Sequence, residues 1–348
     1  MDLQQLVADH PELDGHIHLP KPDTWVLELS GEIDGAVFEA IDESGIKISA
    51  ARFDATHNFI DILHALETYH AFDSVHDLHL TRIDGLTHQN LENVLTSPAT
   101  NHLRTLNLGM NNFDDSYVDT ILDFARIDEL EKLSLNHNEM TEAALLKITA
   151  RDPQRLTVLN LADQGGWNDQ HTHEAVHSSL VKRLDLLFVG GNDLTPETTT
   201  QLQFPEVDFD EEFEIGDLAS LGRRATLLHN EHVVEKVSSK LSEFDDVEAV
   251  RELVRLLLTN DGAISVRNAL VLSAYLEVSK LLIDGVLNIL GDNKTLPVPV
   301  AQAIGEILAE RIDGPIADLE RLMEAFEAKG LPVQHLDSAV THASSLRE

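Results

Sequence analysis

A pattern of leucines that occurs twice in the middle of the chain limits its possible folds more than any other feature. The first copy is Leu103-x-x-Leu106-x-Leu108-x-x-Asn111-x-Phe113, and the second is Leu130-x-x-Leu133-x-Leu135-x-x-Asn138-x-Met140. Such a pattern is typical of proteins in which each short unit buries its apolar face against the next. The chain is therefore expected to stack copies of one small structural unit.

The second leucine of each copy serves as a marker for the pattern along the chain. The markers predict strands at Ile46, Leu78, Leu106, Leu133, Leu159 and Leu187, with later spacings of 28, 27, 26 and 28 residues. Apolar residues between the strands recur at helical spacing, for example over Ser116 to Phe124 and Thr141 to Thr149. Each unit is thus predicted to contain a strand, a turn and a helix.

One polar position inside the pattern also recurs. Asn111, Asn138 and Asn192 are expected to hydrogen-bond the backbone of adjacent turns, which would otherwise remain unpaired in the interior. Gln164 takes this position in another unit and is followed by Gly165-Gly166-Trp167, so an irregularity is expected there.

From about Trp25 to Leu202 the chain resembles the leucine-rich repeat superfamily, and a period near 28 with a helix in each unit is similar to its ribonuclease-inhibitor-like class. The resemblance implies an α/β solenoid with parallel strands on the concave face and helices on the convex face. It also implies that the concave face binds proteins, although the motif is specific for fold rather than for function.

Changes in the pattern predict four segments. Residues 1–24 form an N-terminal arm or cap, 25–204 the leucine-rich repeat domain, 205–216 an acidic linker, and 217–348 an all-helical domain. A last edge strand is expected at 204–209. Caps and periodicity in the final segment predict helices at 217–228, 231–243, 246–259, 263–275, 277–290, 299–311, 315–328 and 336–345.

The charge of the chain limits its partners. Its formal net charge is -36, from 61 acidic and 25 basic residues, which disfavours binding to nucleic acid and to anionic membranes. The acidity serves either solubility, for instance in a saline habitat, or the attraction of a basic partner. The chain contains no cysteine, basic leader or apolar membrane span, and so a cytoplasmic protein is expected.

Residues that flank the marker leucines are predicted to point to the concave face, because successive strand residues alternate in direction. They are Lys47 and Ser49; Asp77, His79 and Thr81; Thr105, Asn107 and Gly109; Lys132, Ser134 and Asn136; Val158, Asn160 and Ala162; and Leu186, Phe188 and Gly190.

Asp77 is the one carboxylate in this set, which favours a mixed protein-docking surface over an acidic inhibitory one. The residues expected to bind a protein partner are Asn107, Lys132, Asn136, Asn160, Leu186 and Phe188. In the alternative interpretation, the helical domain folds back over these residues.

Other motifs leave enzyme activity as a minor alternative. His173-Glu174-x-x-His177 matches a zinc-site pattern, in which a helix places both histidines on one face. The segment also fits an ordinary polar helix between strands. The acidic run from Asp208 to Glu214 is expected to be a solvated linker with two buried phenylalanines rather than a calcium or basic-peptide site.

The main functional hypothesis is therefore a non-enzymatic scaffold that binds a protein and needs no cofactor. The alternatives are an acidic inhibitor or immunity-type protein that neutralises a basic enzyme or toxin, and a zinc-dependent hydrolase that uses His173 and His177. A homo-oligomer formed through the helical domain is a further possibility.

Overall fold

A computed structural model describes residues 3–56, 59–164, 167, 169–209, 211–241, 244, 249, 286–287, 298, 301–302, 305 and 316–345. The chain divides into two compact units, Met1–Glu206 and Val207–Glu348. Each unit is described by itself below.

Among the described residues of the first unit, eight strands form one sheet in chain order. The first pair of strands is antiparallel, and every later pair is parallel. The strands are β1 (Ile17–Lys21), β2 (Thr24–Ser30), β3 (Ile48–Asp54), β4 (Asp77–Thr81), β5 (Thr105–Asn107), β6 (Lys132–Ser134), β7 (Val158–Asn160) and β8 (Leu186–Phe188).

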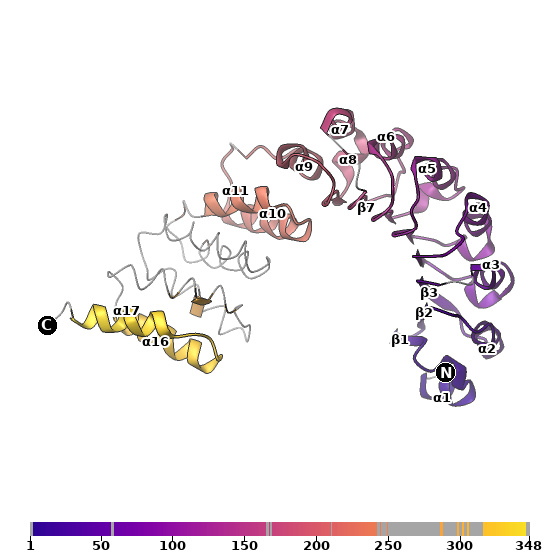
Figure 1. Ribbon diagram of the computed structural model, residues 1–348, viewed down its shortest axis with the longest axis horizontal. Helices are drawn as coiled ribbons and strands as arrows, with labels where there is room; N and C mark the ends of the chain where they lie inside the picture. Colours follow the sequence, from indigo (N-terminus) through magenta and orange to yellow (C-terminus); the bar gives the residue numbers. More distant parts are fainter. Residues whose placement is uncertain are drawn as a thin grey trace. The chain divides into compact units, whose positions relative to one another are not determined.

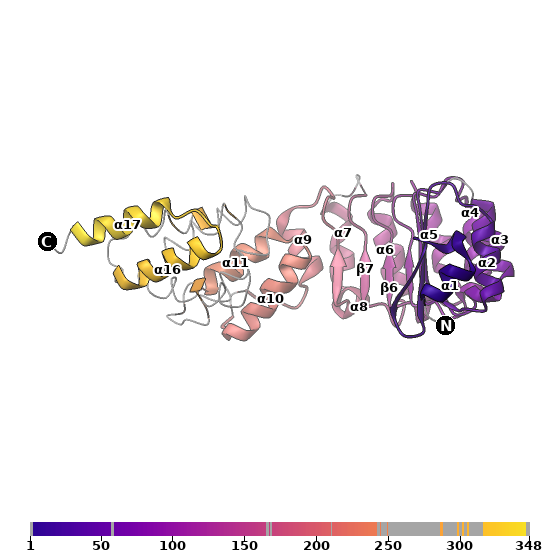
Figure 2. The same ribbon diagram turned by 90° about the horizontal axis from the view of Figure 1, so that it is seen from below.

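Helices alternate with these strands. In the first unit, the strands lie along the inner edge of an arc and the helices along its outer edge (Figure 1), and successive strand and helix modules stand side by side (Figure 2). The helices are α1 (Leu3–Asp9), α2 (Ala36–Ser44), α3 (Phe59–Thr68), α4 (His88–Thr96), α5 (Asp115–Leu122), α6 (Glu142–Arg151), α7 (Asp169–Val176), α8 (Ser179–Arg183) and α9 (Pro196–Gln203), with short 3-10 turns at Pro11–Leu13, His70–Phe72, Pro98–Thr100 and Ile127–Glu129.

One row of aliphatic side chains lies between the sheet and the helices. The strand register places its members opposite one another, and each is at most 1% exposed: Leu27, Ala51, Leu78, Leu106, Leu133, Leu159 and Leu187. A strand of three to five residues cannot bury its own apolar face, so each module needs its neighbours. The predicted solenoid-like arrangement of parallel strands and helices is confirmed.

The first predicted marker is wrong. Ile46 precedes β3, and the residue in register with Leu78 is Ala51, which lies 27 residues before it. The pattern is therefore Ile48-x-x-Ala51-x-Phe53-x-x-Thr56, in which alanine replaces the marker leucine. The core beside this small residue contains three buried aromatic rings, since Phe38 lies 6.2 Å from Phe53 and 6.1 Å from Phe72.

The predicted role of the recurring asparagine is confirmed. Asn111 donates to the carbonyl groups of Leu80 and Leu108 at 2.8 and 3.0 Å and accepts from the Ile83 N–H at 2.8 Å. Asn192 likewise donates to two strand-end carbonyls. These amides replace water as partners for backbone groups at the buried bend.

Gln164 and Trp167 form the irregular module that the sequence indicates. The Gln164 amide donates to the Leu135 carbonyl at 2.7 Å and accepts from the Met140 N–H at 3.3 Å. The indole N–H of Trp167 donates to the Met140 carbonyl at 3.1 Å, and the ring is fully buried. The longer glutamine side chain thus keeps the bond pattern of asparagine, while the tryptophan fills the adjacent core.

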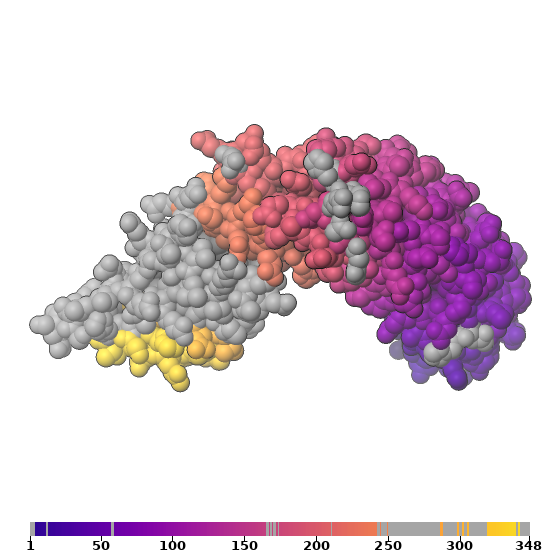
Figure 3. Space-filling view, turned by 45° about the horizontal axis from the view of Figure 1, so that its top comes forward, coloured from indigo at the N-terminus to yellow at the C-terminus, as the bar shows by residue number. Residues whose placement is uncertain are grey.

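Acidic side chains join neighbouring modules near the carboxyl-terminal ends of the helices. The Asp128 carboxylate binds Arg151 at 2.9 Å, and Asp152 binds Arg183 at 2.8 Å. The hydrogen bond from each arginine lowers the pKa of its aspartate. Figure 3 shows one face of the first unit in space-filling form, with the described residues coloured from indigo to magenta in chain order.

The turn after each strand from β3 to β8 adopts a left-handed backbone conformation. Its φ angles lie between +51° and +73° at Ala55, Arg82, Met110, His137, Asp163 and Gly191. This conformation directs a backbone N–H toward the next module. For example, the backbone N–H of Met110 donates to the Asn136 carbonyl at 2.9 Å. Residues other than glycine are strained in this left-handed conformation by about 1–2 kcal/mol.

Replacing Met110 with glycine is expected to raise the free energy of unfolding of the first unit by about 0.5–1 kcal/mol. The side chain of Met110 is 40% exposed, so little packing is lost. Chemical unfolding followed by tryptophan fluorescence measures the change, because both tryptophans, Trp25 and Trp167, lie in this unit. Met110→Ala keeps the Cβ atom and serves as the control; a glycine variant less stable than the alanine variant would contradict the prediction.

The end of the sheet differs from the sequence prediction. The expected edge strand at 204–209 is wrong: α9 runs to Gln203, and turns and irregular backbone follow it. Phe204 continues the helical bonding through its N–H to the Thr200 carbonyl, and Pro205 has no N–H to offer a neighbouring strand. The side-chain amide of Gln203 instead donates to the Leu187 carbonyl of β8 at 3.1 Å.

The described part of the second unit is helical. It contains α10 (Ile215–Leu227), α11 (Glu231–Leu241), α16 (Ile316–Ala328) and α17 (Gln334–Ser345). The helices predicted at 246–259, 263–275, 277–290 and 299–311 lie largely outside the described residues.

The acidic segment at the start of this unit is packed against α11. Phe209 and Phe213 are half-buried rather than fully buried, and Lys236 and Lys240 lie over their rings at 5.0 and 5.6 Å. Lys240 also donates to the Glu211 carbonyl at 3.1 Å. The linker is thus held by cation–π contacts, which the sequence interpretation did not include.

Candidate functional site

The inner face of the sheet carries two rows of side chains that point away from the helices. We call these rows the inner wall. The strand register gives one row as Val26, Ala50, Asp77, Thr105, Lys132, Val158 and Leu186, and the other as Glu28, Arg52, His79, Asn107, Ser134, Asn160 and Phe188. Neighbouring side chains within a row are about 4.8 Å apart, the spacing of paired strands.

The predicted site residues lie together on the carboxyl-terminal half of this wall. Asn107, Lys132 and Asn160 come from β5, β6 and β7, and Leu186 and Phe188 both come from β8. Asn136 lies two residues beyond β6, over the adjacent turn. Lys47 and Ser49 do not belong to the wall, because the strand register puts Ala50 and Arg52 there instead.

The amino-terminal half of the wall is charged, which corrects the expectation of a single carboxylate. Ion pairs and hydrogen bonds join its side chains in series: His18 to Glu28 at 3.6 Å, Glu28 to Arg52 at 2.6 Å, Arg52 to Asp77 at 3.7 Å, Asp77 to His79 at 2.8 Å, and His79 to Asn107 at 3.4 Å. The carboxylates here are therefore matched by cationic or polar neighbours within the protein.

Two aspartates show the strength of this pairing. Burial raises the pKa of Asp77, but its hydrogen bond to His79 and the charge of Arg52 outweigh burial and leave the pKa below its usual value. The hydrogen bond from Arg82 is the largest cause that lowers the pKa of Asp54, and Thr81 donates to the same carboxylate at 2.7 Å. Both carboxylates are thus stabilised in their charged form.

The carboxyl-terminal half of the wall is neutral or positive. Val158, Leu186 and Phe188 are apolar and only half-buried. The exposed Lys132 has no ion-pair partner among the described residues, in contrast to Arg52 and Arg82. This half therefore presents apolar area beside an uncompensated cation.

Asn136 is held within its own turn. Its side-chain oxygen accepts from the Ser134 hydroxyl at 2.8 Å, and its amide nitrogen lies 2.9 Å from the His137 ring. The side chain covers Gly109 so closely that a Cβ atom there would lie 2.5 Å from the Asn136 oxygen. Both polar ends of the Asn136 side chain therefore have partners within its own module.

The zinc-site pattern is divided between a helix and a turn. Helix α7 ends at Val176, so His177 follows it, and Ser178 then caps α8 by accepting from the Val181 N–H. Glu174 and His177 are exposed, and the side chain of His173 lies outside what the structure describes. Within the described residues, no group of three His, Asp or Glu side chains is placed to hold a metal ion.

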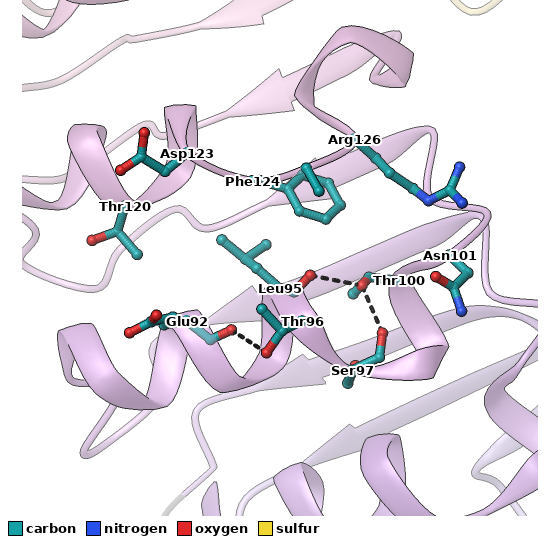
Figure 4. A pocket seen from close by; sticks show the side chains of 11 residues that line it. Glu92, Leu95, Thr96, Ser97, Thr100, Asn101, Thr120, Asp123, Phe124 and Arg126 are labelled. Carbon is teal, nitrogen blue, oxygen red and sulfur yellow. Dashed lines mark hydrogen bonds between the residues drawn. The ribbon is translucent and has the colours of Figure 1, made fainter.

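A hollow of about 440 Å³ lies between the carboxyl-terminal ends of α4 and α5 (Figure 4). The buried side chains of Leu95 and Phe124 line it together with the more polar Thr120 and Arg126. The Arg126 guanidinium binds Glu129 at 2.7 Å. The leucine pattern gave no signal for this hollow, because it forms where two helices end.

Comparison with protein-family models and with curated proteins finds no match. Of the helices in the described ranges, none combines the length and the apolar character needed to cross a bilayer.

Proposed function

We propose that the chain belongs to the leucine-rich repeat superfamily, in its ribonuclease-inhibitor-like class, and binds a protein partner through the carboxyl-terminal half of the inner wall. The observation that carries this proposal is the half-exposed apolar group of Val158, Leu186 and Phe188 on a regular sheet. Large side chains held in place by a rigid scaffold are typical anchors of protein interfaces.

The distribution of charge also supports this part of the wall. The chain has a net charge of -36, yet the two carboxylates in the rows of the wall, Glu28 and Asp77, and Asp54 on the same face, are all ion-paired in its other half. Asp128 in the 3-10 turn and Asp152 directly after α6 pair with arginines of neighbouring modules. The acidic residues are therefore better explained by solubility and by contacts between modules than by the neutralisation of a basic toxin. The neutral half of the wall remains available for docking.

Changing Phe188 and Asn160 together to alanine is expected to abolish capture of the partner by the full-length protein. Removing an aromatic anchor and a polar neighbour weakens typical interfaces at least about tenfold. Pull-down from the native host, with quantitative identification of bound proteins, measures the loss. The circular dichroism spectrum is expected to stay unchanged, since both side chains are half-exposed.

A double variant on the outer surface provides the matched control. Ile60 on α3 is 75% exposed and Asn93 on α4 is half-buried, so Ile60→Ala with Asn93→Ala removes the same classes of side chain away from the wall. The control should retain every partner. Partner capture that survives in the wall variant would contradict the proposed site.

A further inference from the structure

The inner wall around Lys132 is lined by hydrogen-bond donors. Lys132 itself is exposed and carries three N–H groups, and the structure places no carboxylate within ion-pair distance of it among the described residues. By contrast, Arg52 lies between two carboxylates and Arg82 binds Asp54. Lys132 is therefore the cation of the inner wall whose charge no ion pair within the described residues neutralises.

The two nearest asparagines add donors rather than acceptors. The side-chain oxygen of Asn160 accepts from the Ala162 N–H at 3.1 Å, and that of Asn107 accepts from the Gly109 N–H at 3.0 Å. A backbone N–H bonds only to an acceptor, so these contacts fix which amide atom is oxygen. The NH₂ group of Asn160 has no acceptor among the described residues, and it lies one strand away from Lys132.

An apolar patch lies beyond these donors. Leu186 is in the same row as Lys132, two strands further along, with Phe188 in the parallel row. Two strand spacings correspond to about 10 Å, which an extended peptide covers in about three residues. A segment that crosses the strands can therefore reach both groups at once.

We infer that the partner segment carries an Asp or Glu side chain, bound by Lys132 and Asn160, about three residues from a bulky apolar side chain that packs on Leu186 and Phe188. This inference rests on the proposed function and specifies the chemistry of its partner. A buried carboxylate needs charged or donor partners, and this strip supplies both kinds.

The net charge of the chain also limits which partner segments can bind. At physiological salt, charges are screened over about 8 Å, so Lys132 attracts a carboxylate only at close range. A tract of many acids would extend beyond Lys132 and meet the net negative charge of the chain. A segment with one carboxylate, rather than an acidic tail, fits this surface. Polar pairing of this kind determines register and specificity more than total affinity.

Selection of random linear peptides displayed on phage, with the full-length protein as target, tests the inference. Enriched peptides should share an Asp or Glu about three residues from Phe, Leu, Ile or Trp. For a synthetic peptide with an amidated carboxyl terminus, Lys132→Ala should raise Kd at least about tenfold, or about 1.4 kcal/mol. Replacing the peptide acid with its amide should cause the same loss in the natural protein and little further loss in the variant.

The control variant is Lys182→Ala, which removes an exposed lysine at the end of α8 and should leave Kd unchanged. Peptides that need Phe188 but are indifferent to Lys132 and to their own acid would overturn this inference and leave the proposed function standing. Binding that depends on a free carboxyl terminus would also overturn it. If no peptide is enriched, or if binding ignores Phe188→Ala, both proposals fail.

Discussion

Asn138→Ala is expected to lower the free energy of unfolding of the first unit by about 3–5 kcal/mol. The Asn138 side chain is 5% exposed and makes four hydrogen bonds to backbone groups. It donates to the carbonyls of Leu108 and Leu135 and accepts from the N–H groups of Asn111 and Phe113. Alanine leaves buried backbone donors and acceptors with no replacement, and each such group costs about 1–3 kcal/mol.

Urea unfolding followed by tryptophan fluorescence measures this change. Trp167 is a close reporter, because its indole donates to the carbonyl of Met140, two residues after the substituted position. The control is Asn136→Ala, which removes an amide from a half-exposed position and should cost less than about 1 kcal/mol. Equal losses in the two variants would show that the buried amide has no special role.

Gly191→Ala is expected to destabilise the same unit by about 2–3 kcal/mol. Gly191 has a φ angle of +73°, and an added Cβ atom would lie 1.9 Å from a carboxylate oxygen of Asp163. The backbone conformation alone costs about 1–2 kcal/mol for a residue with a side chain. The clash adds to this, because the aspartate must leave the position it occupies near His137.

The adjacent glycine offers a matched control. A Cβ atom on Gly190 would meet nothing within 4 Å, and its φ angle is not positive, so Gly190→Ala should change stability by less than about 0.5 kcal/mol. Adding Asp163→Ala to Gly191→Ala should recover the part of the loss that comes from the clash. A double variant no more stable than Gly191→Ala would assign the whole effect to the backbone.

The repeating architecture could be predicted because leucine occupies positions that determine the strand register directly. From Leu78 to Leu187 every marker found in the sequence lies in the buried row of the sheet. The pattern failed at Ala51, a small residue that belongs to the same buried core as Phe38, Phe53 and Phe72. Alanine is compatible with many environments, so the sequence alone does not identify Ala51 as a member of the buried row.

The candidate site could likewise be predicted only in part. Side-chain alternation correctly brought Lys132, Asn160 and Phe188 to one face, because β6, β7 and β8 follow the leucine pattern. The ion pairs of Glu28 and Asp77 with Arg52 were missed, since they depend on the register of β3 with β2 and with β4. That register shifts between Trp25 and Val26, and single-chain periodicity carries no signal for such a shift.

The two edges of the sheet differ from the parallel strands between them, and this has a consequence for self-association. At one edge β1 is the outermost strand and runs antiparallel to β2, so the parallel order of the modules ends there. At the other, the Gln203 amide binds the Leu187 carbonyl that faces outward from β8. Open strand edges are templates for fibre growth. A further parallel module would therefore meet an antiparallel strand at one end and an engaged carbonyl at the other, which disfavours end-to-end stacking of separate chains.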